Sequence, residues 1–200
     1  MLKKVTVDPR IRAKRSELIA EPMIVHVQKF DEDAVKEFRE QFEKALHSGQ
    51  PVVPILIDSY GGSVYGCLDM ISYIKNSPIP VDTIICGKAM SAGAILFGMG
   101  RNRYMAENAT LMLHDASMMT GGKNEEIKSD AKELDRLNTL IFKLLAENCG
   151  HKDDYFVKLL HDKGHADWFL TPKEAKKHKI CTHIHVPELR VNIALDYSFS

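Results

Sequence analysis

The segment Gly87–Ala94, with the sequence Gly-Lys-Ala-Met-Ser-Ala-Gly-Ala, presents one hydroxyl, that of Ser91, among small residues. Serine is a weak nucleophile at its own pKa, so it needs a base to take its proton and a carboxylate to orient that base. His114, at the end of the apolar run Thr110–Leu113, is a candidate base, and Asp167 is a candidate carboxylate. These residue types predict a hydroxyl nucleophile at Ser91.

Donors for an oxyanion are the remaining requirement of such a site. Gly61 and Gly62 follow an apolar run that ends at Asp58, and glycine lets bare backbone approach a substrate. A helix that begins at Ser91 would direct its first N–H groups toward developing negative charge. Each feature alone has a simpler interpretation, because a serine before a helix is usually a cap. Their joint occurrence favours catalysis.

Strands and helices alternate along the first two thirds of the chain. Continuous apolar runs of four to eight residues indicate buried strands, and apolar residues at steps of three and four indicate helices. Proline at position 54 weakens one strand prediction slightly, because proline donates no ladder hydrogen bond. The expected strands lie at 23–27, 52–57, 81–86, near Tyr104 and at 111–114, and the expected helices at 35–46, 64–74 and 91–99. These repeated β-α-β units predict an α/β sheet with right-handed crossovers.

A long amphipathic helix is expected after Gly122. Its apolar stripe continues from Ile127 to Leu144, over about 25 residues. Such a helix commonly projects from its domain, so the stripe would pack against a partner subunit or, alternatively, within the same chain. A shorter helix is expected at 153–163. Another begins at the capping box Thr171–Glu174, which places Asp167 just before it.

The chain ends differ from the middle. Residues 1–20 are polar and basic without periodicity, which predicts an N-terminal arm, and residues 21–186 are the expected peptidase domain. The C-terminal tail at 187–200 alternates apolar residues from Val191 to Tyr197 and could add a strand.

Composition excludes several classes of protein. The chain has 200 residues, 44% of them hydrophobic, which suits one globular domain. Lysine plus arginine and aspartate plus glutamate both number 27, so no basic field favours nucleic acid or an anionic membrane. The charged start and the absence of a long apolar stretch predict a soluble, cytoplasmic protein. The four cysteines lack paired spacing, which favours buried free thiols.

Four motifs, taken in order, resemble the proteolytic subunit family of the Clp protease, ClpP. They are Asp58-Ser-Tyr-Gly-Gly62, Met90-Ser-Ala-Gly-Ala94, Leu113-His114 and Asp167-Trp-Phe-Leu-Thr-Pro-Lys-Glu-Ala175, and the match covers about residues 23 to 186. The resemblance implies the ClpP/crotonase-like fold with a protruding handle helix, whose region lies at about 117–150. It also implies a serine endopeptidase that works through an acyl-enzyme and needs no cofactor.

The resemblance assigns roles to individual residues. It implies Ser91 as nucleophile, His114 as general base and Asp167 as the carboxylate that orients the imidazole. The backbone N–H groups of Gly62 and Ala92 would form the oxyanion hole. An extended substrate would bind as an added strand. Its binding residues would be Gly61, Gly62, Met118, Gly121 and Gly122.

The resemblance also implies partners. These are further copies of the chain in a ring, a heptamer or a stacked double ring, and an unfolded protein or peptide as substrate. A partner AAA+ unfoldase is in doubt, because the N-terminal arm lacks a recognisable axial-loop sequence. Tyr60, Ser63 and the pair Asp115–Ala116 depart from the family pattern. If the Asp115 carboxylate approached His114, it would shift the active pH upward.

Alternative interpretations remain open. A dedicated maturation protease of the phage-capsid type and a relative of the signal-peptide peptidases use similar chemistry, whereas an inactive ring subunit would only bind. A crotonase-type acyl-CoA enzyme would not need the three catalytic residues together. Lys88 suggests a Ser-Lys dyad as a weaker choice. Histidines 161 and 165, and the alternating Cys181, His183 and His185, lack the spacing of a zinc site, so no metal is expected.

Overall fold

The computed structural model describes residues 22–189. One compact unit, Met23–Pro187, carries the helices and strands of the described residues. The predicted arm at 1–20 and the alternating residues from Val191 to Tyr197 lie outside the described residues.

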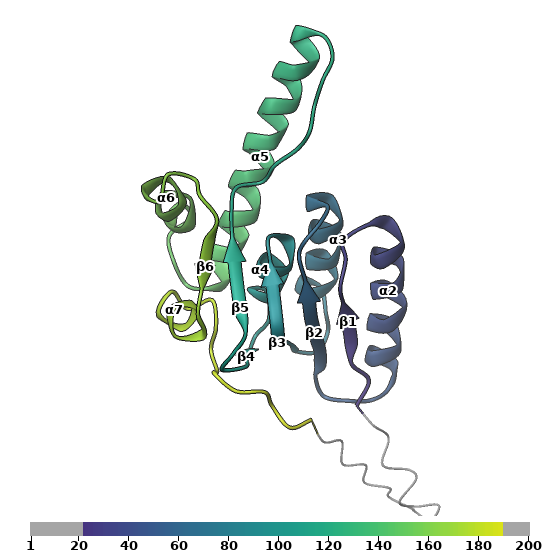
Figure 1. Ribbon diagram of the computed structural model, residues 1–200. Coiled ribbons are helices and arrows are strands. Elements are labelled where there is room, and N and C mark those ends of the chain that lie inside the picture. The colour runs from purple at the N-terminus through teal and green to yellow at the C-terminus, as the bar shows by residue number, and fades with distance from the viewer. Residues whose placement is uncertain (1–21, 190–200) are drawn as a thin grey trace, which may run out of the picture. The chain divides into compact units, whose positions relative to one another are not determined.

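One six-stranded sheet organises the unit Met23–Pro187 (Figure 1). Its strands are β1 (Val25–Val27), β2 (Val53–Ser59), β3 (Val81–Met90), β4 (Arg103–Met105), β5 (Thr110–Leu113) and β6 (Trp168–Leu170). The order is β1-β2-β3-β5-β6, and β4 pairs with the first half of β3, ahead of β5. All these pairs are parallel except the antiparallel pair of β5 and β6.

Within residues 22–189, six helices connect or flank these strands. They are α2 (Glu32–His47), α3 (Val64–Lys75), α4 (Ala92–Phe97), α5 (Asn124–Asn148), α6 (Tyr155–Asp162) and α7 (Pro172–Lys177). The first three lie between successive parallel strands, which confirms the predicted α/β class with repeated β-α-β units. The capping box of α7 forms as predicted, since the Thr171 hydroxyl accepts from Glu174 N–H and the Glu174 carboxylate accepts from Thr171 N–H.

The predicted apolar stripes form the core. On α2, which the Asp31 carboxylate caps through Ala34 N–H, the stripe packs toward the sheet. Its buried members are Val35, Phe38, Phe42 and Ala45. Pro54 fits inside β2 because pairing with β1 begins only at the next residue, Ile55, so no ladder bond to β1 is lost there.

Strand β3 is longer than the sequence predicts. It continues beyond residue 86 to Met90, because β5 takes over from β4 as its partner along the same edge. Pairing with β4 ends at Ile85, and pairing with β5 begins at Lys88. This extension carries the chain to Ser91, and its pairing with β2 shifts register between Ile57 and Ser59.

Helix α5 has 25 residues, as its long stripe predicts. Its C-terminal half packs within the chain, and the Asn148 amide donates to the carbonyls of Gly98 and Gly100. Its buried residues are Leu137, Ile141, Phe142, Leu145 and Ala146. The N-terminal half extends past the sheet, with Ile127 exposed (Figure 1). Among residues 22–189, neither this helix nor any other is long and apolar enough to cross a membrane.

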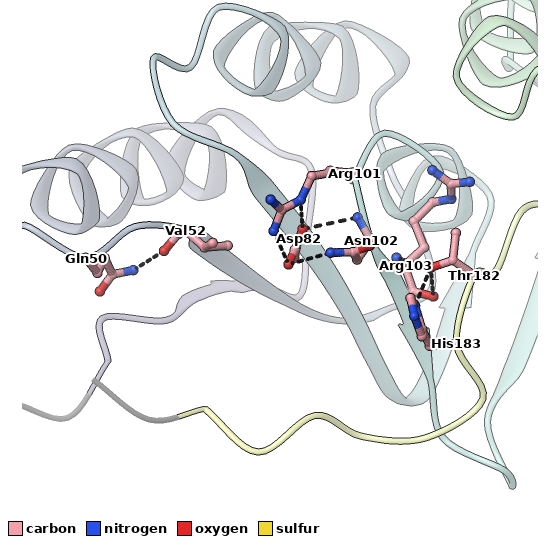
Figure 2. A network of polar contacts seen from close by, with 8 residues as sticks. All are labelled: Gln50, Val52, Asp82, Arg101, Asn102, Arg103, Thr182 and His183. Carbon is pink, nitrogen blue, oxygen red and sulfur yellow. Dashed lines mark hydrogen bonds and ion pairs between the residues drawn. The ribbon is translucent and has the colours of Figure 1, made fainter. Parts of the chain in front are cut away.

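A polar network holds β4 between β3 and the chain after α7 (Figure 2). The Asp82 carboxylate accepts from the Arg101 guanidinium and from the backbone and side-chain amides of Asn102. The buried guanidinium of Arg103 donates to three carbonyl oxygens, those of Gly100, Lys179 and Ile180. Two of these carbonyls, those of Lys179 and Ile180, lie in the chain just after α7. The three charged groups of the network, those of Asp82, Arg101 and Arg103, therefore all have polar partners.

The cysteines are free, as expected, but they are not all buried. Cys67, Cys149 and Cys181 are buried, whereas Cys86 is exposed. The exposure of Cys86 corrects the expectation, because this residue falls between the parts of β3 that pair with β4 and with β5. Burial raises the pKa of the Cys67 thiol to about 12 and that of Cys149 to about 11.

We therefore predict that thiol reagents at pH 8 modify Cys86 in the native protein and reach the three buried cysteines only on unfolding. Burial removes both access and the thiolate form that reacts. Mass spectrometry of peptides after timed labelling measures the four rates. Modification of native Cys67 as fast as Cys86 would contradict this packing.

Candidate active site

The predicted site residues follow the ends of neighbouring strands. Parallel neighbours end at the same edge of a sheet, and this carboxyl edge is where open α/β sheets bind ligands. Gly61 comes after β2, Ser91 after β3 and His114 after β5. Because β6 runs antiparallel to β5, Asp167, which precedes β6, lies at this same edge. The topology thus gathers positions that are far apart in the sequence.

Ser91 occupies a strained turn between β3 and α4. Its φ of 54° and ψ of −124° are unusual for a residue with a side chain. The backbone around it is firmly held, since Ser91 N–H donates to Met112 O at 2.9 Å and Ser91 O accepts from Ala94 and Ile95. Strain of this kind persists only where the surrounding structure imposes it, and it is concentrated at functional sites.

The Ser91 hydroxyl contacts the imidazole of His114. The distance from Ser91 Oγ to His114 Nε2 is 2.8 Å, within the range of a hydrogen bond. The pairing of Met90 with Met112 brings the two residues near each other, because Ser91 is one position beyond this pair on β3 and His114 is two positions beyond it on β5. The pair has the geometry of a nucleophile and its base.

Asp167 lies on the other side of the imidazole. The register pairs Leu113 with Trp168, so His114 and Asp167 are the next opposing positions. Asp167 Oδ1 is 3.6 Å from His114 Nδ1, which is an ion-pair contact but is longer than a hydrogen bond. The Asp167 side chain is 56% exposed, against 26% for His114. Ser91, His114 and Asp167 therefore lie in a row. The contact between His114 and Asp167 is longer than the contact between Ser91 and His114.

The two glycines pass close to Ser91 and Phe30. A Cβ on Gly61 would lie 2.7 Å from Ser91 Cβ and 2.9 Å from Met90 O, and its φ of +105° is itself unfavourable for other residues. A Cβ on Gly62 would lie 3.0 Å from Phe30 Cβ. Gly61 N–H donates to the Ser59 hydroxyl, which in turn donates to Gln28 O. The turn therefore requires glycine and is fastened by Ser59, which sequence reasoning had not singled out.

Ala92 begins α4 directly beside this turn. Ala92 N lies 3.2 Å from the position that a Cβ on Gly61 would occupy. The first N–H groups of a helix have no carbonyl partner within the helix. The backbone of Gly61 and the backbone N–H of Ala92 thus lie close to each other and to the Ser91 side chain.

Lys88 is engaged away from Ser91. Its ammonium lies 2.8 Å from Asp58 Oδ1 and 4.5 Å from the centre of the Tyr60 ring. The hydrogen bond to Asp58 raises the pKa of Lys88. A lysine held in its charged form is a poor base, so these contacts do not favour the Ser-Lys dyad.

The segment between β5 and α5 contains Met118, Gly121 and Gly122. It forms no strand, and Met118 and Met119 are exposed. Gly122 has a φ of +142°. No hydrogen bond or ion pair links these three residues to Ser91 or His114 in the described part of the chain, so their role in substrate binding remains a prediction.

Asp115 does not turn toward His114. Its Oδ1 accepts from the Asn138 amide at 3.0 Å, and its Oδ2 contacts His165 Nδ1. The condition for the hypothesis of an upward shift in active pH, an approach of the Asp115 carboxylate to His114, is therefore not observed. Neither Asn138 nor His165 had been linked to the site from sequence, because their proximity depends on how α5 and α6 pack.

The other histidines have ordinary polar or aromatic partners. The rings of His161 and His165 lie edge to face, and the ring of His183 stacks on Tyr104. The chain from residue 22 to residue 189 contains no group of three or more histidine, cysteine, aspartate or glutamate residues arranged to hold a metal ion.

Comparison with known proteins identifies the family. The profile described as Clp protease matches residues 8–187. The chain belongs to the Clp protease family. It is 29% identical over 128 residues to the ATP-dependent Clp protease proteolytic subunit 3 of Streptomyces coelicolor, covering 63% of this chain and 57% of that protein. It is 29% identical over 134 residues to subunit 2 of Corynebacterium efficiens, covering 66% of this chain and 65% of that protein.

A third similar protein has a name from the same family. The ATP-dependent Clp protease proteolytic subunit of Deinococcus radiodurans is 30% identical over 134 residues, covering 66% of this chain and 64% of that protein. The match thus spans less than two thirds of the length of each of these relatives. The α/β sheet described above is consistent with membership of this family.

The fastening of the glycine turn gives a stability prediction. Ser59→Ala leaves the Gly61 N–H and Gln28 carbonyl without their partner, so we expect a loss of roughly 1–3 kcal/mol in the free energy of unfolding. Ser72→Ala, which removes an exposed hydroxyl that bonds only within α3, is the matched control and should stay within about 0.5 kcal/mol. Urea denaturation measures both, and equal midpoints would contradict the fastening role.

Proposed function

We propose that this chain is a serine endopeptidase that hydrolyses peptide bonds through an acyl-enzyme, with Ser91 as nucleophile, His114 as base and Asp167 as orienting carboxylate. The observation that carries the proposal is the 2.8 Å contact between Ser91 Oγ and His114 Nε2 at the carboxyl edge of the sheet. Membership of the Clp protease family supports the same chemistry.

The reaction has two halves. Ser91 Oγ attacks the carbonyl carbon of the peptide bond while its proton passes to His114 Nε2. The carbon–nitrogen bond then breaks as His114 returns that proton to the leaving amine, which leaves an ester on Ser91. Water hydrolyses this ester by the same route and releases the carboxylic acid. Asp167 stabilises the imidazolium that forms in both halves.

The oxyanion would be bound by the N–H groups of Gly62 and Ala92. The close approach of Gly61 to Ser91 and Ala92 supports this, because it brings the glycine turn and the start of α4 next to the reacting hydroxyl. Backbone donors held this rigidly stabilise negative charge without reorganising.

The substrate would be an unfolded protein or a peptide that binds in extended form. Gly61 and Gly62 would offer backbone on one side, and the segment with Met118, Gly121 and Gly122 on the other. An extended peptide that pairs with backbone is recognised mainly through main-chain hydrogen bonds, so the site would accept many sequences. No cofactor takes part in the proposed chemistry.

The chain would act within an assembly of identical copies, a heptameric ring or a stacked double ring that encloses the sites in a chamber. The exposed N-terminal half of α5 supports this, since an amphipathic helix that extends past its own sheet has apolar surface for a partner. A AAA+ unfoldase would supply substrate, as the words "ATP-dependent" in the names of the relatives suggest. A native mass equal to one chain would contradict the assembly.

The proposed roles predict which residue an active-site reagent labels. A fluorophosphonate should modify Ser91 in the wild-type protein, and His114→Ala should slow both labelling and peptide hydrolysis by at least about 10³-fold. Asp167→Asn should lower kcat by about 10²- to 10⁴-fold, because asparagine would neither orient the imidazole nor stabilise the imidazolium. His26→Ala, which removes an exposed imidazole at β1, is the control and should leave both rates unchanged.

Peptide mapping of the labelled protein decides the outcome. Label on a residue other than Ser91, or no label on a folded assembly, would refute the proposal. The second result would favour an inactive ring subunit.

The close approach of Gly61 to Ser91 predicts that a substitution in the glycine turn lowers kcat. Gly61→Ala should reduce kcat by about 10²-fold, because the new methyl group would push the turn away from Ser91 and displace the oxyanion donors. Gly150→Ala is the matched control, since Gly150 also has a positive φ of +68° but no atom within 4 Å of its would-be Cβ. Steady-state kinetics measures both variants. Equal losses in the two would mean that backbone strain, and not the approach to Ser91, explains the effect.

A further inference from the structure

A second polar cluster adjoins the proposed catalytic residues and joins three elements. Its members are Asp115, which follows His114, Asn138 on α5, and His165, two residues before Asp167. Asn138 accepts from Ala116 N–H at 2.9 Å and donates to Asp115 Oδ1 at 3.0 Å. Asp115 Oδ2 contacts His165 Nδ1. Because an ionised carboxylate only accepts, the imidazole of His165 is the donor in this contact.

The chain at His165 has an unusual conformation. Gly164 and His165 both have positive φ, +69° and +59°. They end α6, where His165 N–H donates to Leu160 O. A left-handed residue with a side chain is unfavourable unless its contacts hold it there. The geometry at the end of α6 thus directs the His165 side chain to Asp115.

The cluster connects the two loops that carry the base and its carboxylate. The contact between Asp115 and His165 lies beside the contact between His114 and Asp167, and it joins the same two stretches of chain. Within residues 22–189 the Asp167 carboxylate has no polar partner other than His114, at 3.6 Å. The position of Asp167 therefore depends on what holds its loop.

We propose that Asp115 and His165 are positioning residues, which with Asn138 hold the loop of Asp167 against His114. Asp115 acts on the neighbouring loop through its carboxylate, and Asn138 fixes that carboxylate and the backbone of Ala116 to α5. This inference rests on the proposed function for its kinetic part, and on the contacts alone for its structural part.

Two substitutions at His165 separate the hydrogen bond from the backbone conformation. Glycine and asparagine both tolerate positive φ, but only asparagine keeps an N–H donor on the side chain. The His165 side chain is 52% exposed, so neither change disturbs the core. The experiment compares His165→Gly and His165→Asn with wild type in the full-length assembly. It measures kcat and KM for a fluorogenic peptide, and amide hydrogen exchange of residues 163–170.

The proposal predicts that His165→Gly lowers kcat by about 10-fold with KM unchanged, since a misplaced carboxylate affects the reaction more than binding. Exchange of residues 163–170 should be about 10-fold faster in the same variant. His165→Asn should match wild type within about 2-fold in both measurements.

Three results would overturn the proposal: equal behaviour of the two variants, an effect on KM alone, or a loosened loop with unchanged kcat. If the wild-type protein cleaves no peptide, the proposed function fails. The exchange rates then still decide whether the hydrogen bond holds the loop, and equal rates in the two variants would refute that part as well.

Discussion

The arrangement of the site depends on the parallel pairing of β2, β3 and β5 and on the antiparallel addition of β6. The first three strands end at one edge, and β6 begins there, so the residues beyond each strand meet without long loops. A shift of one position between β5 and β6 would move Asp167 away from His114, since successive side chains of a strand point to opposite faces. The inner residues of β2 and β3, buried among apolar helices, keep this pairing fixed.

Strand pairing alone does not form the site, because the reacting groups also need an unusual backbone. The positive φ of Ser91 and the close approach of Gly61 are both unfavourable without support. The support comes from hydrogen bonds, those of Ser59 with Gln28 and Gly61, and that of Ser91 N–H with Met112 O. The contact between Ser91 and His114 is short, and the His114 side chain is less exposed than that of Asp167. The position of Asp167 depends on its loop.

The sequence predicted much of this from local signals. Apolar periodicity located α2 to α6 and the strands β1 to β5 within a few residues, and the capping box at Thr171 located α7. It did not predict β6, which has only three residues. The motifs around Ser91, His114 and Asp167 led to the family, and the pairing brings these residues together. The contacts of Asp115 with Asn138 and His165 could not be predicted. They join residues far apart in the sequence, and no motif or periodicity links these residues. The exposure of Cys86 was missed because it depends on where β5 replaces β4.

The most direct test of the central claim is the structure of the assembly after reaction with a fluorophosphonate. The account predicts phosphorus bonded to Ser91 Oγ and a phosphoryl oxygen within about 3 Å of the N–H groups of Gly62 and Ala92. It also predicts His114 between Ser91 and Asp167, with the Asp167 carboxylate within hydrogen-bond distance of Nδ1. An adduct on another residue, or a phosphoryl oxygen that points away from both N–H groups, would contradict it.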